Sequence, residues 1–156
     1  MTELAVVIAG GSPAGMMLAA ELALAKVDVA VVERRPDHVL VGSRAGGFHS
    51  HKIEVLDQRG FADRFLAGGL VAQTAMFALT VVEMSDFPTR HPNGLGIWQN
   101  QIELIMATWI AELPVRICHG CEVTGCPTRG STELETPATR PTTAVRRGTT
   151  APEVSR

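Results

Sequence analysis

A glycine-rich segment near the N-terminus contains residues whose types and spacing suit phosphate binding. Its sequence is Gly10-Gly11-Ser12-Pro13-Ala14-Gly15, a G-x-G-x-x-G pattern with serine at the second glycine. In such a loop the first glycine allows a tight exit from a strand, and the last lets a helix pack close to a sheet. The following helix offers free N–H groups and a positive dipole end to phosphate oxygens. We therefore take all six residues as candidate dinucleotide-binding residues.

An acidic residue stands at the spacing that such a loop requires. Glu33 follows Gly10 by 23 residues and ends a second apolar segment. A carboxylate at that place accepts a hydrogen bond from a ribose hydroxyl and disfavours a 2′-phosphate. The alternative, in which no ligand is bound, is a tight strand-to-helix turn with Glu33 at a solvated strand end. A Walker-type phosphate loop is excluded, because no Gly-Lys-Ser/Thr follows the glycines.

The elements that must position these residues can be read from the surrounding pattern. Leu4–Ala9 is a continuous apolar run, which is typical of a strand buried on both faces. Pro13–Lys26 is predicted to be a helix, with Ser12 as N-cap and proline at the first helical position. Val27–Val32 is a second apolar strand. Two such strands joined by a helix pair in parallel through a right-handed crossover, which predicts the α/β class and a Rossmann-like β-α-β unit.

The middle of the chain alternates helical and extended patterns. Asn100–Leu113 is predicted to be an amphipathic helix, with Asn100 and Glu103 at capping-box spacing. Lys52–Ala67 is predicted to be a helix with Gly60 as a weak point. The expected extended segments are Ala75–Val82, Leu95–Trp98, Val115–Cys118 and Cys121–Thr124.

Composition bounds the classes of function. The chain has 156 residues, 46% of them hydrophobic, and a formal net charge of −2, which gives no general attraction to nucleic acid or anionic lipid. Glycine, proline and charged residues interrupt the apolar N-terminal stretch, so we expect no membrane segment and a cytoplasmic protein. Residues 1–126 are predicted to form one domain. Residues 127–156 are rich in Thr, Pro and Arg and are predicted to be a disordered tail.

Three cysteines lie close together near the end of the predicted domain. They are Cys118, Cys121 and Cys126. An odd number clustered late in the chain is not a secreted disulfide framework. A structural zinc site needs four ligands, usually two such pairs, so no metal site is predicted. A thioredoxin-type pair belongs at a helix N-terminus, whereas this pair follows a strand.

Several segments together resemble one enzyme family. They are Val6–Glu33, Gly42–Gly47, Glu54–Gly60 and Leu95–Glu103, with continuity to Gly125. They resemble the N-terminal part of FAD-dependent aromatic hydroxylases of the p-hydroxybenzoate hydroxylase fold, in the polyketide and rifampicin branch. The resemblance implies FAD as cofactor, NADPH as co-substrate, O₂ as oxidant and a small aromatic molecule as substrate. It names no catalytic side chain, because the flavin carries the chemistry.

The resemblance also implies roles for individual residues. Arg44 would lie against the FAD diphosphate and ribityl region, and Gln99 would contact the flavin side of the cofactor. Glu33 takes the ribose role, and neighbouring Arg34 is a further candidate. The alternatives are a solvated loop charge for Arg44, a solvent-facing helix residue for Gln99 and a solvent-facing arginine for Arg34.

The match stops near Gly125. The later Asp-Gly and Gly-Asp motifs of the family are absent from the sequence, as are its substrate sheet and C-terminal helices. We therefore expect a truncated or frame-shifted product, or a fragment of a longer enzyme, that is inactive as this short chain. Two other functions stay open: a non-catalytic FAD-binding remnant and an NAD-binding dehydrogenase domain. Neither the substrate nor the oligomeric state can be read from the sequence.

Overall fold

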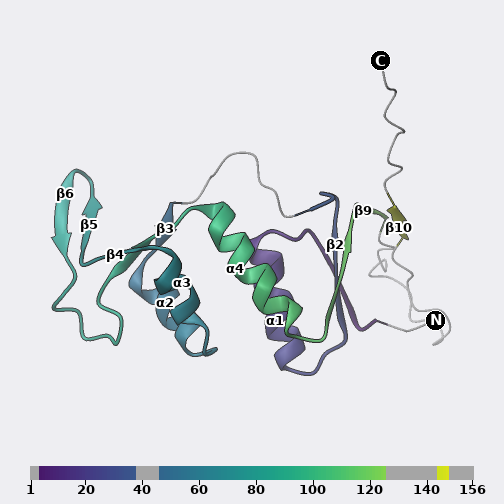
Figure 1. The fold of residues 1–156 in the computed structure, drawn as a ribbon, viewed down its shortest axis with the longest axis horizontal. Coiled ribbons are helices and arrows are strands. Elements are labelled where there is room, and N and C mark those ends of the chain that lie inside the picture. The colour runs from purple at the N-terminus through teal and green to yellow at the C-terminus, as the bar shows by residue number, and fades with distance from the viewer. Residues whose placement is uncertain (1–3, 38–45, 126–143, 148–156) are drawn as a thin grey trace, which may run out of the picture. The chain divides into compact units, whose positions relative to one another are not determined.

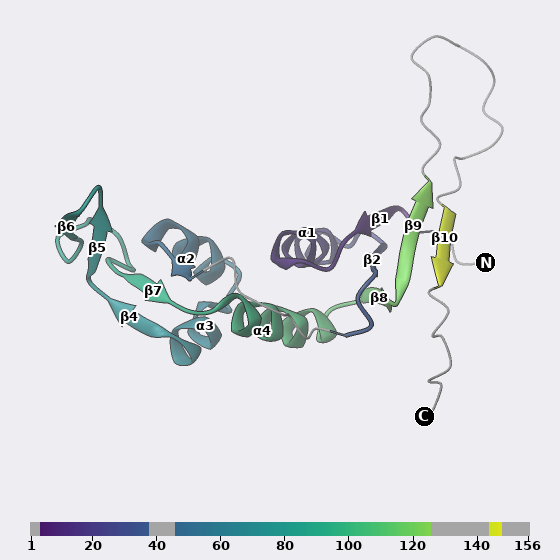
Figure 2. The same cartoon turned by 90° about the horizontal axis from the view of Figure 1, so that it is seen from above.

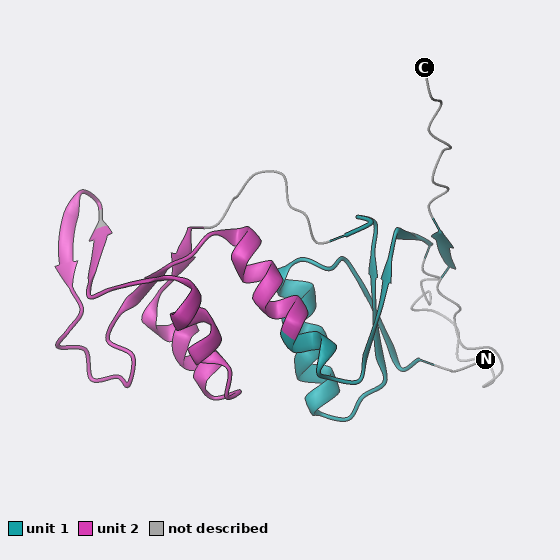
Figure 3. Cartoon of the chain, viewed as in Figure 1, with its two compact units in different colours: residues 1–37, 109–156 teal, residues 38–108 magenta. Residues whose placement is uncertain are grey.

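The computed structural model describes residues 4–37, 46–125 and 144–147, and it divides into two compact units (Figure 3). Unit 1 comprises residues 1–37 and 109–156, and unit 2 comprises residues 38–108. The chain thus leaves unit 1 after its first β-α-β segment and returns to it near the end of the last helix. Each unit is described by itself.

Unit 1 is built on a parallel sheet (Figure 1). Its strands are β1 (Val6–Ala9), β2 (Val29–Glu33) and β8 (Val115–His119), in the order β1-β2-β8 with β2 central. Helix α1 (Pro13–Leu24) connects β1 to β2 and packs against the sheet. The predicted strand-helix-strand unit is confirmed, with its element ends displaced by one or two residues.

The packing of α1 follows from the small side chains on one of its faces. Met16, Ala19, Ala20 and Ala23 recur at helical spacing, and all four are buried. The short alanine side chains let the helix axis approach the strands closely. Every residue of β2 is buried. This close approach brings the N-terminus of α1 next to the carboxyl ends of β1 and β2.

Two further strands complete the described part of unit 1. Strand β9 (Cys121–Gly125) pairs antiparallel with β10 (Ala144–Arg147), as Figure 2 shows. Val145 pairs with Val123, and the Arg146 guanidinium lies 3.4 Å from the Glu122 carboxylate. These four residues differ from the disordered tail that was predicted there, because the edge of β9 offers them backbone partners. The other residues of the predicted tail lie outside the described part of the chain.

Unit 2 combines short helices with antiparallel strands. Its sheet has the order β3-β7-β4, and β5 and β6 form a separate hairpin. Helix α4 begins in this unit and ends in unit 1. The elements are β3 (Gly47–Phe48), α2 (Ser50–Asp57), α3 (Ala62–Gly68), β4 (Leu70–Ala72), β5 (Thr74–Phe77), β6 (Thr80–Glu83), β7 (Gly94–Gly96) and α4 (Gln99–Ala111).

Two sequence predictions for unit 2 need correction. The single helix predicted over Lys52–Ala67 is two helices, α2 and α3, because Gly60 adopts a φ of +73° that ends the first one. The single strand predicted over Ala75–Val82 is the β5–β6 hairpin. It turns at Ala78 and Leu79, whose φ values are +46° and +66°.

The core of unit 2 is aromatic and aliphatic. The Phe65 ring is 1% exposed and lies 5.4 Å from the Phe48 ring and 5.3 Å from the Phe61 ring, centroid to centroid. In α4 the predicted apolar stripe is buried at Ile102 and Met106. None of the helices in the described residues has the length and hydropathy needed to cross a membrane.

Candidate dinucleotide-binding site

The glycine loop leaves the carboxyl end of β1 and runs directly into α1. Gly10 has a φ of +109°, which glycine alone adopts easily, and its N–H donates to the Val32 carbonyl at 2.8 Å. Ser12 is the N-cap of α1 and Pro13 is its first residue, as predicted, although the serine side chain makes no capping hydrogen bond. Ser12 and Ala14 are exposed. The open end of the helix therefore faces outward with first-turn amides that have no partner inside the helix.

Two of the glycines are required by the space around them. A Cβ on Gly15 would collide with the Gly10 carbonyl oxygen, so any side chain there would push the helix off the strand. A Cβ on Gly11 would lie 3.1 Å from a Glu33 carboxylate oxygen. The loop is thus packed tightly against β1 on one side and against the acidic residue on the other.

Glu33 is the polar centre of the site. It is only 7% exposed, and its Oε2 accepts the Gly11 N–H at 2.6 Å. Its Oε1 accepts the Arg35 backbone N–H at 2.8 Å and lies 3.2 Å from Arg35 Nε. The structure therefore joins the loop and the acid, two features that the sequence placed 22 to 23 residues apart. The alternative of a solvated strand end is wrong.

The surroundings of Glu33 keep it ionised. Burial alone would raise the pKa of its carboxyl group. The hydrogen bonds from the Arg35 backbone and side chain, the Gly11 N–H and the positive charge of Arg35 outweigh burial and lower the pKa from 4.5 to about 2. At neutral pH the site thus contains a buried, fixed negative charge.

Arg35 is the functional residue that sequence reasoning missed. Besides holding the Glu33 carboxylate, its guanidinium donates to the Gly11 carbonyl at 3.3 Å. The signal was present, because alternate residues of an extended chain lie on the same side, and Arg35 stands two residues after Glu33. Arg34, the arginine named from the sequence, is exposed and makes neither of these contacts.

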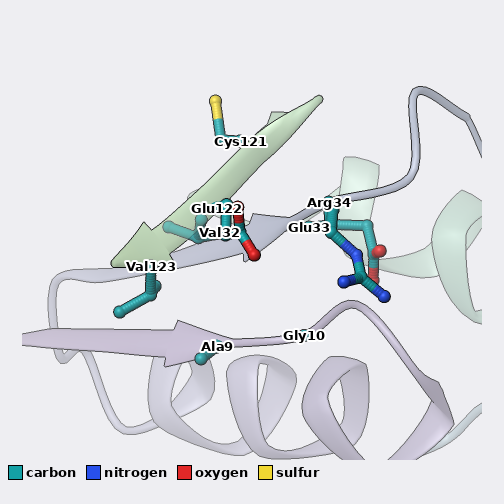
Figure 4. Close-up of a pocket in the computed structure, with 8 residues that line it drawn as sticks. All are labelled: Ala9, Gly10, Val32, Glu33, Arg34, Cys121, Glu122 and Val123. Atoms are coloured by element: carbon teal, nitrogen blue, oxygen red, sulfur yellow. The ribbon is translucent and has the colours of Figure 1, made fainter. Parts of the chain in front are cut away.

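A pocket adjoins the loop and the acid. It has a volume of about 290 Å³ and is lined by the ends of β1 and β2 and by the first half of β9 (Figure 4). Arg34 and Glu122 contribute charged groups to its wall. Ligands of open α/β sheets bind at the carboxyl ends of the strands, and this pocket lies there.

Two further candidates come from the resemblance. Gln99 is the first residue of α4 and belongs to unit 2, where its side-chain amide donates to the buried Glu103 carboxylate at 3.0 Å. This contact replaces the capping box predicted between Asn100 and Glu103. Arg44 lies outside the described residues.

The cysteine pair is a disulfide. Cys118 and Cys121 are joined across the turn between β8 and β9, with their Cα atoms 5.8 Å apart. Among the residues that the structure describes, no group of three or more metal-ligating side chains occurs.

These features define the class of protein. A parallel strand, a glycine turn, a closely packed helix and an ionised acid at the end of the second strand make a Rossmann-type dinucleotide-binding unit. The family description "FAD binding domain" matches residues 3–145. The chain belongs to this family of FAD-binding domains.

Several relatives of the chain are monooxygenases. It is 38% identical over 121 residues to anhydrotetracycline monooxygenase of Streptomyces rimosus, and 37% identical over 120 residues to rifampicin monooxygenase of Rhodococcus hoagii. These matches cover 76% of this chain but only 24% and 25% of the two relatives. The chain thus spans about a quarter of their length.

A solved structure agrees with the fold. The OxyS anhydrotetracycline hydroxylase from Streptomyces rimosus superimposes with a TM-score of 0.73 at 34% identity, covering 79% of this chain and 25% of that one. The predicted α/β class and the predicted resemblance to the tetracycline and rifampicin hydroxylase branch are confirmed.

Proposed function

We propose that this chain binds FAD through the cofactor's ADP half, as the FAD-binding module of a monooxygenase that hydroxylates aromatic substrates with NADPH and O₂. The observation that carries the proposal is the buried Glu33–Gly11 hydrogen bond, which fixes the ribose-binding acid against the phosphate loop beside a pocket. The family match and the monooxygenase relatives support FAD as the dinucleotide.

The residues present fit the ADP half of the cofactor. A side chain at Gly15 has no room, and the exposed amides of the first turn of α1 suit a diphosphate. Glu33 is ionised and accepts from the Gly11 and Arg35 backbone amides, and the Arg35 guanidinium lies 3.2 Å from one carboxylate oxygen and 3.5 Å from the other. A carboxylate has about four acceptor sites, so a ribose hydroxyl would take the place of one of these longer contacts with the guanidinium. Arg35 positions Glu33 and neutralises its charge within the protein.

Bound FAD would supply electron transfer from NADPH and oxygen activation. The chain's own residues would bind and orient the adenosine diphosphate. Arg44 against the diphosphate and Gln99 toward the flavin are further parts of the proposal, taken from the resemblance alone.

A second candidate is a non-catalytic FAD-binding remnant. Both candidates share the FAD site and differ in turnover. An NAD-binding dehydrogenase domain is compatible with Glu33 but has no support from the family match.

Cofactor titrations with the purified chain test the proposal. The fluorescence of FAD should be quenched when it binds, and ADP should compete with FAD for the site. FMN, which lacks the adenosine half, should bind at least tenfold more weakly than FAD. Gly15→Ala should abolish FAD binding, whereas Gly125→Ala, at a glycine with open space around it, should leave it unchanged. Equal affinity for FMN and FAD, or tighter binding of NAD⁺ than of FAD, would overturn it.

A further inference from the structure

The disulfide lies at the edge of the pocket that Gly10, Glu33 and Cys121 line, which is the candidate adenosine pocket of the proposed function. Cys118 is the last residue but one of β8, and Cys121 is the first residue of β9, so the bond closes the turn between the two strands. Cys121 itself lines the pocket, and Figure 4 shows it at the start of β9 above the end of β2. No role in the proposed FAD chemistry has been assigned to this pair.

Backbone contacts connect the turn to the acidic residue. In the parallel pairing of β2 with β8, Val32 is opposite Cys118 and Glu33 is opposite His119. At the tip of the turn the Gly120 N–H donates to the Arg35 carbonyl at 3.1 Å. Arg35 in turn binds the Glu33 carboxylate through its backbone N–H and its guanidinium. Two contacts, Gly120 with Arg35 and Arg35 with Glu33, therefore connect the turn that the disulfide closes to the acidic residue.

The turn needs a constraint to hold this geometry. Gly120 has a φ of +64°, a conformation that it exchanges freely for others when nothing holds it. The disulfide closes the short loop around Gly120 and restricts that freedom. The two sulfurs differ in access, because Cys121 is 1% exposed whereas Cys118 is half-buried.

We infer that Cys118 and Cys121 form a reversible redox site whose oxidised state holds the β8–β9 turn against Arg35 and thereby preorganises the adenosine pocket. The effect on adenosine binding rests on the proposed function, whereas the restraint that the disulfide places on the β8–β9 turn does not. A small thiol is the class of reagent that reduces the disulfide, and a peroxide is the class that forms it again from the two thiols.

The reaction balances in both directions. In reduction, an external thiolate attacks the more accessible Cys118 sulfur, the S–S bond breaks, and Cys121 leaves as a thiolate that takes a proton from water. A second external thiolate then displaces Cys118, giving two protein thiols and one external disulfide. In oxidation, one protein thiolate attacks hydrogen peroxide to give a sulfenic acid and water. The second cysteine displaces that hydroxyl group, which leaves the disulfide and a second water.

The expected consequence is a redox-dependent affinity. Loss of one preorganising constraint near a binding site lowers affinity about three- to tenfold. ADP is the probe, because it carries the adenosine and diphosphate without a flavin that itself reacts with thiols and peroxide. The oxidised chain should bind ADP more tightly than the chain reduced with dithiothreitol.

The experiment uses the whole chain in its two redox states. Thiol titration in denaturant should count one thiol, that of Cys126, after peroxide treatment and three after reduction. ADP affinity is measured in both states. Cys126→Ser is the control and should keep the redox dependence, whereas Cys118→Ser/Cys121→Ser should bind ADP at the weaker affinity in both states. Reduction of the unmutated chain gives the same comparison without relying on the folding of that variant.

A second readout separates this inference from the proposed function. The exchange rate of the Gly120 amide hydrogen should rise severalfold on reduction, because its bond to the Arg35 carbonyl is then released. If ADP binds neither state but Gly120 exchange still depends on the redox state, the proposed function fails and the redox site stands. Three thiols after peroxide treatment, unchanged Gly120 exchange, or equal ADP affinities in the two states would overturn the inference.

Discussion

At the scale of single residues, one partly buried ion pair organises the site. Glu33 accepts from the Gly11 and Arg35 backbone amides and pairs with the Arg35 side chain, so the acid, the loop and the strand end are locked together. An unpaired buried carboxylate would neutralise itself, whereas this one is held ionised with a pKa near 2. The charge that we propose to bind a ribose therefore also stabilises the fold.

The pH dependence of stability follows from Glu33. Its pKa is lowered from 4.5 to about 2, so its stabilisation is present above pH 4.5 and is lost as the pH falls toward 2. At about 1.4 kcal/mol per pH unit, this corresponds to about 3 kcal/mol. Glu33→Gln should lower the free energy of unfolding by that order at pH 7 and by about 1 kcal/mol at pH 3, which is only one pH unit above the pKa of the folded state, as measured by urea denaturation.

The matched control is another carboxylate of unit 1. Glu122 forms an exposed ion pair with Arg146, and such pairs contribute about 0–1 kcal/mol. Glu122→Gln should therefore change stability little at either pH. Similar losses for both variants at pH 7 would contradict the central place given to Glu33.

The two arginines named from the sequence should differ in their effect on binding. Arg34 is exposed and does not bind Glu33 in the way that Arg35 does, whereas the family resemblance puts Arg44 on the cofactor diphosphate. A charge-assisted phosphate contact is worth about 1.5–3 kcal/mol, or roughly ten- to a hundredfold in affinity. Arg44→Ala should weaken FAD binding by that factor in a flavin titration and Arg34→Ala by less. Equal effects would remove Arg44 from the site.

At the scale of elements, the site depends on how closely α1 lies on β1. The buried alanines of α1 set that distance, and Gly15 marks the point of closest approach. The helix N-terminus is useful to a phosphate only because it is held at the carboxyl end of the strand. Helix packing and cofactor binding therefore both require small residues where α1 approaches β1.

The substitution Gly15→Ala tests whether the close approach of α1 to β1 contributes to stability. Its new Cβ would meet the Gly10 carbonyl, which belongs to the backbone and has little room to yield. We expect a loss of about 1–3 kcal/mol, as for other overpacked sites, seen as a lower thermal midpoint. Gly125→Ala, with no atom within reach of the added Cβ, should stay within about 0.5 kcal/mol of the unmutated chain. An unchanged thermal midpoint for Gly15→Ala would show that the close approach of α1 to β1 does not contribute to stability.

Strongly periodic elements could be predicted from the sequence, and tertiary choices could not. The β1-α1-β2 unit and α4 have apolar patterns long enough to specify their type and face. The break at Gly60 and the turn at Ala78 and Leu79 depend on local backbone conformations that periodicity does not report. From the sequence Glu33 is expected to bind a ribose alone, because the alternation that puts Arg35 on the same side does not tell whether its guanidinium reaches the carboxylate.

At the scale of the whole molecule, the chain contains an FAD-binding domain and spans about a quarter of the length of the relatives that it matches. Two units are described, and the Rossmann-type site lies wholly within unit 1. The contacts that we propose for the glycine loop and Glu33 with the adenosine half lie in that unit. Hydroxylation requires a substrate pocket and exclusion of water around the flavin, which the relatives' remaining three quarters have room to supply.

Turnover should therefore be uncoupled in this chain. With FAD and NADPH present, any NADPH oxidation should appear as an equal amount of hydrogen peroxide, without hydroxylated product. A paired assay of NADPH loss and peroxide, run with a panel of phenolic polyketides, measures both. Hydroxylated product in proportion to NADPH consumed would show that the short chain is a complete enzyme.

The central claim is that the glycine loop and Glu33 together hold the ADP half of FAD, and amide hydrogen exchange with and without FAD tests it most directly. Bound FAD should slow exchange in residues 10–16 and 33–35 and leave the hairpin residues 80–83 unchanged. ADP alone should reproduce the protection in unit 1. FAD binding that leaves residues 10–16 and 33–35 unprotected would contradict the claim.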